Sequence, residues 1–86
     1  MELLHPAIGI LNHYDCINHT ELLSTTQFYI KNGCNQVKTA EQMNIHLNTL
    51  KYRLKRIEEI GKLDFKKDKE IFYLRLSIEI LNAEAS

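Results

Sequence analysis

The segment 35–60 constrains the fold most, because it contains two helical patterns separated by only three residues. Asn35 can cap a short helix that reaches Met43, since its side chain can accept a backbone N–H from the first turn. Asn44 follows, and asparagine tolerates the positive φ that a tight turn after a helix requires. A second helix is predicted from Leu47 to about Ile60. These two helices are therefore joined by the shortest link in the chain.

The rest of the chain also favours helices. Its 86 residues allow one core, and glycine and proline are scarce, with no Asn-Gly pair between alternating patterns. We therefore predict an all-α domain of five helices that spans residues 1–86. Besides the two helices above, with Gly61 just beyond the second, the sequence predicts one helix from Pro6 to about Asp15–Cys16, one capped by Thr20 and ended by Asn32-Gly33, and one capped by Asp68 that reaches about Asn82.

The formal net charge is zero, but the charges are distributed unevenly along the chain. Between Lys38 and Lys67 there are eight basic and four acidic residues, whereas the remainder has three basic and seven acidic ones. The stretch between His46 and Ile57 contains four basic residues and no acidic one. A nucleic acid responds to this local field rather than to the sum of all charges. The zero net charge therefore does not exclude a nucleic-acid partner.

The predicted helix 47–60 is amphipathic. Leu50, Leu54 and Ile57 fall within about 60° of one another on a helical wheel, which predicts that they are buried. The opposite face carries amides, a hydroxyl, an aromatic ring and cations, which suit base edges and phosphates. An arbitrary basic helix more often presents only a solvated charged face. The exposed set is centred on Asn48, Tyr52 and Lys55, flanked by Thr49 and Lys51, and extended by Arg56, with Arg53 at the border.

The short helix before the turn decides between these two interpretations. A short helix, a tight turn at Asn44 and a second helix with an outward basic face form a helix-turn-helix. Ala40 is small where the two helices would cross, and a larger side chain would push them apart. The structural positions of this motif are Ala40, Met43, Asn44, Ile45, Leu50 and Leu54.

Residues 39–57 also resemble a known family. The run His46-Leu47-Asn48-Thr49-Leu50-Lys51-Tyr52-Arg53-Leu54 is similar to the C-terminal DNA-binding domain of the PucR/CdaR-type regulators, which include the sugar-diacid and purine-catabolism regulators. It is more distantly similar to the helix-turn-helix of the factor for inversion stimulation, so the expected fold is Fis-like. Leu47 departs from the family pattern, which usually has Arg there, and Met43 stands where Leu is commoner. Outside this run, the resemblance covers His5-Pro6-Ala7-Ile8, Tyr14-Asp15, Thr20-Glu21-Leu22-Leu23, Tyr29-Ile30 and Asp68 through Ile80.

The resemblance implies that the chain is the C-terminal part of a longer regulator with N-terminal sensory or effector-binding regions, in which case Met1 is an expression start. We expect sequence-specific binding to double-stranded DNA in transcription regulation, in the cytoplasm and without a cofactor. The alternative is a helical protein-interaction or dimerisation module that has lost DNA binding, for which Leu47 and the zero net charge are the arguments. The expected groove or base contacts are Leu47, Asn48, Thr49, Lys51 and Tyr52, and the expected phosphate contacts are Lys38, His46, Lys55 and Arg56.

The last predicted helix carries two apolar stripes, where a surface helix in a small domain needs only one. One stripe contains Ile71, Leu74, Ile78 and Leu81. Either the core wraps this helix on two sides, or the second stripe contacts another chain or an absent domain. A homodimer of the full-length protein is the expected partner arrangement. The second stripe consists of Phe72, Leu76 and Ile80.

No other chemistry is indicated. His13, Cys16 and His19 would spread too widely to grip one zinc ion, so no metal site is predicted, and Cys16 is expected to be buried with His13 at the surface. The glycines are too far apart for a phosphate loop, and no catalytic arrangement is visible, so we do not expect an enzyme. Two cysteines make no disulfide framework, and no apolar run is long enough to span a membrane.

Overall fold

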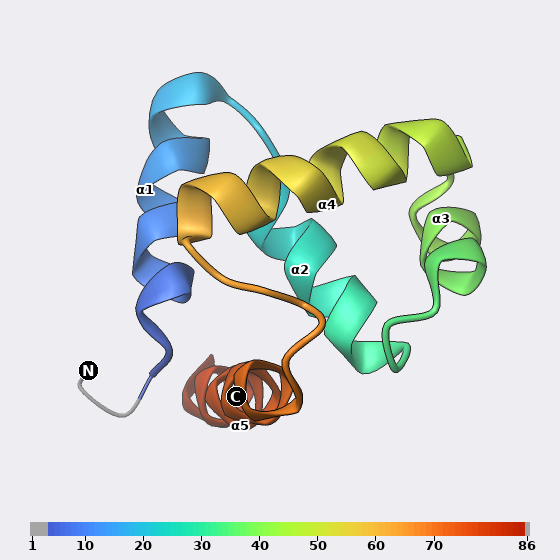
Figure 1. Ribbon diagram of the computed structural model, residues 1–86. Helices are drawn as coiled ribbons and strands as arrows, with labels where there is room; N and C mark the ends of the chain where they lie inside the picture. Colours follow the sequence, from blue (N-terminus) through green and yellow to red (C-terminus); the bar gives the residue numbers. More distant parts are fainter. Residues whose placement is uncertain (1–3, 86) are drawn as a thin grey trace.

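The computed structural model describes residues 4–85, which form five helices and no strand within that range (Figure 1). The all-α prediction is therefore confirmed, and so is the number of helices. α1 and α5 continue a few residues past their expected ends, and Asp68 is the first residue of α5 rather than its cap. The helices are α1 (Pro6–Asn18), α2 (Leu22–Lys31), α3 (Gln36–Met43), α4 (Leu47–Gly61) and α5 (Asp68–Ala85).

The helix α4 lies across the others and packs against α1, α2 and α3 (Figure 1). α3 lies beside the N-terminal end of α4, and α1 crosses near the C-terminal end. α5 packs against α2, away from α4 in the view of Figure 1. The outer faces of α4 and α5 are therefore two separate surfaces of the molecule.

The core takes apolar side chains from every helix, with Leu11, Leu50, Ile57 and Leu74 fully buried. Three threonine side chains and one serine side chain are buried among them. Each donates a hydrogen bond to a backbone carbonyl one helical turn earlier, so burial leaves no hydroxyl unpaired. These bonds run from Thr25 to Glu21 (2.6 Å), Thr26 to Leu22 (2.9 Å), Thr39 to Asn35 (2.7 Å) and Ser77 to Tyr73 (2.8 Å).

The start of α2 differs from the prediction. Thr20 does not cap it, because the N-cap residue is Glu21, whose side chain makes no capping bond. Instead, the Asp15 carboxylate of α1 accepts the backbone N–H groups of Leu22 and Leu23, at 2.9 and 2.8 Å. The Thr20 hydroxyl also donates to Asp15. The helix is thus capped from another helix, and an anion at a helix N-terminus is well placed against the helix dipole.

Two helix ends also differ from the sequence-based expectation. At the end of α2, Asn32 has φ −92°, and the left-handed residues are Gly33 and Cys34, both at φ 63°. At the end of α4, Gly61 is still helical, and Lys62 takes the left-handed conformation with φ 53°. Gly61 is buried, and a Cβ built there would lie 3.2 Å from the Ala7 Cβ. The glycine therefore serves the close approach of α1 and α4, not the end of the helix.

His5 ties the start of α1 to α5. Its Nδ1 accepts the backbone N–H of Ala7 at 3.0 Å, which caps α1. Its Nε2 lies 2.9 Å from a carboxylate oxygen of Glu70, and its backbone N–H donates to the Ser77 hydroxyl at 2.7 Å. The Tyr73 hydroxyl donates to the carbonyl of Leu4 at 3.1 Å. These bonds fix the entry of the chain beside α5.

The two stripes of α5 have different environments. Leu74 and Ile78 of the first stripe are buried, and Ile71 and Leu81 pack against the core. In the second stripe, Phe72 is 67% exposed, Leu76 is 50% exposed and Ile80 is half-buried. The domain's own core therefore covers only one side of this helix.

Candidate nucleic-acid interface

The turn between α3 and α4 has the predicted geometry. Asn44 adopts φ 56° and ψ 47°, which is the left-handed conformation predicted for it from the sequence. Its backbone N–H points to the carbonyls of Ala40 and Glu41, and the N–H of Ile45 bonds to the Ala40 carbonyl at 3.0 Å. Asn35 caps α3 as expected, because its side-chain oxygen accepts the backbone N–H of Lys38 at 2.9 Å. The ends of α3 are thus closed by bonds that the chain makes locally.

The angle between α3 and α4 is filled by the residues that the motif assigns to it. Ala40 is only 5% exposed, and Leu50 and Leu54 are buried in the common core. Met43 and Ile45 are half-buried, and Ile45 packs against the core. Since these side chains fix how α4 sits on α3, the packing also fixes which face of α4 points outward.

The outward face of α4 carries the polar residues that the helical wheel predicted. Tyr52 is 66% exposed, and Arg53 at the border is half-buried. The other residues of this surface carry hydrogen-bond donors or acceptors or positive charges. Lys38 of α3 is also exposed. The exposed residues of this surface, here called the α4 face, are Asn48, Thr49, Lys51, Tyr52 and Lys55.

The two acidic residues of α4 lie near its C-terminal end, away from the turn. Glu58 accepts the backbone N–H of Phe65 at 2.9 Å and so holds the α4–α5 loop. Glu59 pairs with Arg56, with 3.2 Å between the nitrogen and the carboxylate oxygen. The first turns of α4 therefore present cations without an acidic neighbour in the same helix, which favours an anionic partner at that end.

Two half-buried arginines of α4 contact residues of other helices or of the segment before α2. Arg56 lies 3.0 Å from the Tyr14 hydroxyl and stacks near its ring, with 5.9 Å between guanidinium carbon and ring centre. Hydrogen bonds to Tyr14 and Glu59 raise the pKa of Arg56 above its usual value. Arg53 reaches back to Thr25 at 3.4 Å and Glu21 at 3.7 Å. The contact with Tyr14 was not predictable from the sequence, since it joins residues of two separate helices.

His46 and Leu47, at the start of α4, have different environments. Leu47 is half-buried and lines a shallow hollow with Val37, Ala40 and Glu41 of α3. His46 is exposed, and its Nδ1 accepts the backbone N–H of Asn48 at 3.0 Å. This imidazole is therefore the N-cap of α4. The sequence reasoning identified His46 only as a phosphate contact and missed the cap.

The cysteine and histidine residues of α1 do not form a site. Cys16 is exposed, contrary to the prediction, because α1 buries Ala7, Ile8 and Leu11 and turns its later residues outward. Within residues 4–85, no three His, Cys, Asp or Glu side chains are grouped so that they could hold a metal ion. Cys34 is half-buried, and burial raises the pKa of its thiol.

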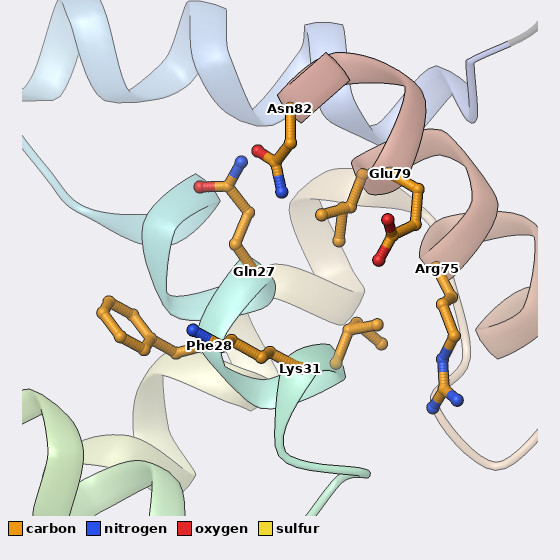
Figure 2. A pocket seen from close by; sticks show the side chains of 8 residues that line it. Gln27, Phe28, Lys31, Arg75, Glu79 and Asn82 are labelled. Atoms are coloured by element: carbon orange, nitrogen blue, oxygen red, sulfur yellow. The ribbon is translucent and has the colours of Figure 1, made fainter. Parts of the chain in front are cut away.

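A cleft lies between α2 and α5 (Figure 2), and none of its lining residues belongs to α4. Its floor contains the buried Ile30 and Ile78. Gln27 and Asn82 lie at one end, and Arg75 lies at the other (Figure 2). The remaining lining residues are Phe28, Lys31 and Glu79, so charges of both signs line the cleft.

The comparison with known families agrees with this geometry. Residues 22–80 match the family described as the PucR C-terminal helix-turn-helix domain. The chain belongs to this family. The match covers α2 to most of α5, including the whole α3–turn–α4 unit. This PucR-type chain is a helix-turn-helix domain of the DNA-binding, transcription-regulator class.

The PucR-type domain is similar to parts of longer curated proteins. PutR of Bacillus subtilis (strain 168), a proline-responsive transcriptional activator, is 39% identical over 64 residues, or 74% of this chain and 16% of PutR. AdeR of the same organism, a DNA-binding transcriptional activator, is 34% identical over 74 residues, or 86% of this chain and 18% of AdeR. An uncharacterised protein of Haemophilus influenzae is 38% identical over 80 residues, or 91% of this chain and 21% of that protein. The PucR-type domain thus spans about a fifth of the length of these relatives.

No solved structure matches the PucR-type chain. Within residues 4–85, none of the helices is long and apolar enough to cross a membrane.

Proposed function

We propose that this domain binds double-stranded DNA in a sequence-specific manner, with α4 in the major groove. The observation that carries the proposal is the α4 face: an exposed set of amide, hydroxyl, phenol and ammonium groups on the second helix of a helix-turn-helix. A helix of this motif fits the major groove, where each base pair presents a distinct pattern of donors and acceptors. The DNA-binding activator AdeR, with 34% identity, supports the same function.

Asn48 is the residue on which specificity depends most in this proposal. It is exposed, and it lies one residue inside the start of α4, where a recognition helix contacts base edges. Its amide suits adenine, whose N6 and N7 it can bond together. Thr49, Lys51 and Tyr52 are the further candidates for bases or adjacent backbone, and Leu47 is the candidate for a thymine methyl.

Phosphates would be bound by the cations at the edges of the α4 face. Lys38 and Lys55 are exposed, and no hydrogen bond from their ammonium groups lies within residues 4–85. Arg56 is a further candidate, and its guanidinium already pairs with Glu59 at 3.2 Å. His46 is the remaining candidate. Such contacts position the domain on DNA without reading its sequence.

We also propose that the domain works as part of a homodimer of a longer protein with N-terminal sensory or effector-binding regions. The relatives are about five times as long as this chain. Recognition helices of dimeric regulators lie about 34–36 Å apart on one DNA face. The domain measures 34 × 28 × 27 Å, so two copies at that spacing can touch along their longest axis. The exposed apolar stripe of α5, with Phe72, Leu76 and Ile80, is the surface we assign to this contact.

A second candidate function is a protein-interaction module that has kept the fold and lost DNA binding. Leu47 favours it, because an apolar residue stands near the start of α4, beside an exposed Val37, where a cation would serve DNA better. The dependence of duplex binding on salt concentration distinguishes the two functions. Binding to DNA releases counterions and weakens steeply with salt, whereas a protein-interaction module has no affinity for a random duplex even at low salt.

The test combines a salt titration with one substitution. The wild-type chain should bind a random-sequence duplex with a steep salt dependence, and a preferred duplex can be selected from a randomised pool. Asn48→Ala should then weaken binding to the preferred duplex by about 1–3 kcal/mol and leave binding to the random duplex nearly unchanged. Equal losses on both duplexes would show that Asn48 does not read bases, and no binding at low salt would favour the interaction module.

A further inference from the structure

The imidazole of His46 has one nitrogen committed to α4 and one nitrogen free. Nδ1 accepts the Asn48 N–H at 3.0 Å, so Nδ1 carries no proton. A ring in this state is neutral and carries its proton on Nε2. His46 is exposed, so its Nε2–H donor is accessible to a partner. Residues 4–85 provide no acceptor for it.

His5 shows in the same molecule what such a donor binds. Its Nδ1 caps α1 by accepting the Ala7 N–H at 3.0 Å, the same bond to the second residue along. Its Nε2 lies 2.9 Å from the Glu70 carboxylate, an anion. His46 has the same capping geometry, but no carboxylate within residues 4–85 contacts its Nε2. The anion at His46 would therefore come from outside the protein.

We infer that His46 donates its Nε2–H to a DNA phosphate oxygen while its Nδ1 caps α4. The inference rests on the proposed DNA binding and gives His46 a role within it. The contact is a hydrogen bond from a neutral ring, unlike that of the lysines of the α4 face. The same ring holds the backbone of Asn48, the residue proposed to read bases. The His46 side chain thus connects a contact with the DNA backbone to the position of Asn48.

Because the His46 ring is neutral, its contact with phosphate should affect the salt dependence of binding differently from a lysine contact. A lysine that neutralises a phosphate releases counterions, and its loss reduces the log–log salt slope by about 0.9. A neutral donor releases none, so its loss lowers the affinity without changing the slope. The matched comparison is Lys55→Ala, which should lower both. Loss of the His46 donor alone should reduce affinity by about tenfold, as expected for a hydrogen bond to a charged oxygen.

Two substitutions separate the two nitrogens. In His46→Asn the side-chain oxygen takes the place of Nδ1 and keeps the cap, but no donor reaches the position of Nε2. We expect unchanged thermal stability, an equal loss of about tenfold on random and preferred duplexes, and an unchanged salt slope. In His46→Gln the amide nitrogen takes the place of Nε2, and the cap is lost. We expect a lower melting temperature, a nearly normal affinity for the random duplex, and a reduced preference for the selected duplex.

The ring-nitrogen chemical shifts of His46 in the free chain give a direct readout, and they should show a protonated Nε2 and an unprotonated Nδ1. The inference is overturned if the shifts show the other tautomer, or if His46→Asn binds the random duplex as tightly as wild type. It is also overturned if His46→Asn lowers the salt slope as Lys55→Ala does, because the ring would then act as a cation. In each of these outcomes the wild-type chain still binds DNA. Failure of the wild type to bind the random duplex at low salt would instead remove the proposed function.

Discussion

Replacing Gly61 by alanine should destabilise the domain, although the same replacement normally stabilises a helix. Gly61 is the last residue of α4, and alanine in a helix is favoured over glycine by up to about 1 kcal/mol. Against this, the new Cβ would lie 3.2 Å from the Ala7 Cβ and 3.3 Å from a methyl of Leu63. Leu63 can change its rotamer, but the Ala7 Cβ moves only with the backbone of α1. Overpacking of this kind typically costs about 1–3 kcal/mol.

The overpacking term is the larger one, so we expect a net loss of about 1 kcal/mol, or about 4–8 °C in melting temperature for a domain of this size. Gly9→Ala is the matched control. Gly9 is helical and exposed in α1, and a Cβ there would have nothing within 4 Å. It should raise the melting temperature by helix propensity alone. Thermal unfolding followed by circular dichroism measures both. If Gly61→Ala is as stabilising as Gly9→Ala, α1 and α4 are not in close contact at this point.

Three further predictions concern the motif and its surfaces. Ala40→Leu should lower the unfolding free energy by about 1–3 kcal/mol through overpacking where α3 crosses α4, and an unchanged melting temperature would contradict the burial of Ala40. Leu47→Arg should raise the affinity for a random duplex and steepen the log–log salt slope by about 0.9, whereas a flat response would mean that position 47 does not face DNA. Leu76→Glu should leave the fold intact, because Leu76 is 50% exposed, and should abolish any self-association seen by sedimentation of the wild type. A strictly monomeric wild type would refute the interface assigned to α5.

The helix-turn-helix was predictable from sequence because its determinants are local. Asn35 caps α3 through a side chain three residues from the N–H it binds, and Asn44 is a residue that accepts positive φ. Leu50, Leu54 and Ile57 fall on one side of α4 simply because a helix has 3.6 residues per turn. The polar α4 face is the complement of that stripe. Local preference and periodicity therefore fixed both the motif and its outward residues.

The tertiary structure decided what depends on distant partners. Asp15 replaces Thr20 as the cap of α2 because α1 places its carboxylate there. Gly61 stays helical because Ala7 lies against it, and Arg56 is drawn to Tyr14. None of these pairs has a spacing that a helical wheel or a capping rule relates.

The same distinction applies to the surfaces that we assign to partners. The sequence showed two apolar stripes on the last helix but not which one the core would take. The structure buries Leu74 and leaves Phe72 67% exposed, because α2 is the only one of the described helices that packs against α5. It likewise revealed that His46 caps α4 and keeps one nitrogen free. A sequence determines its turns and amphipathic faces through neighbouring residues. How the helices pack decides which of these faces are covered. It also decides which polar groups keep an unused hydrogen-bond donor or acceptor.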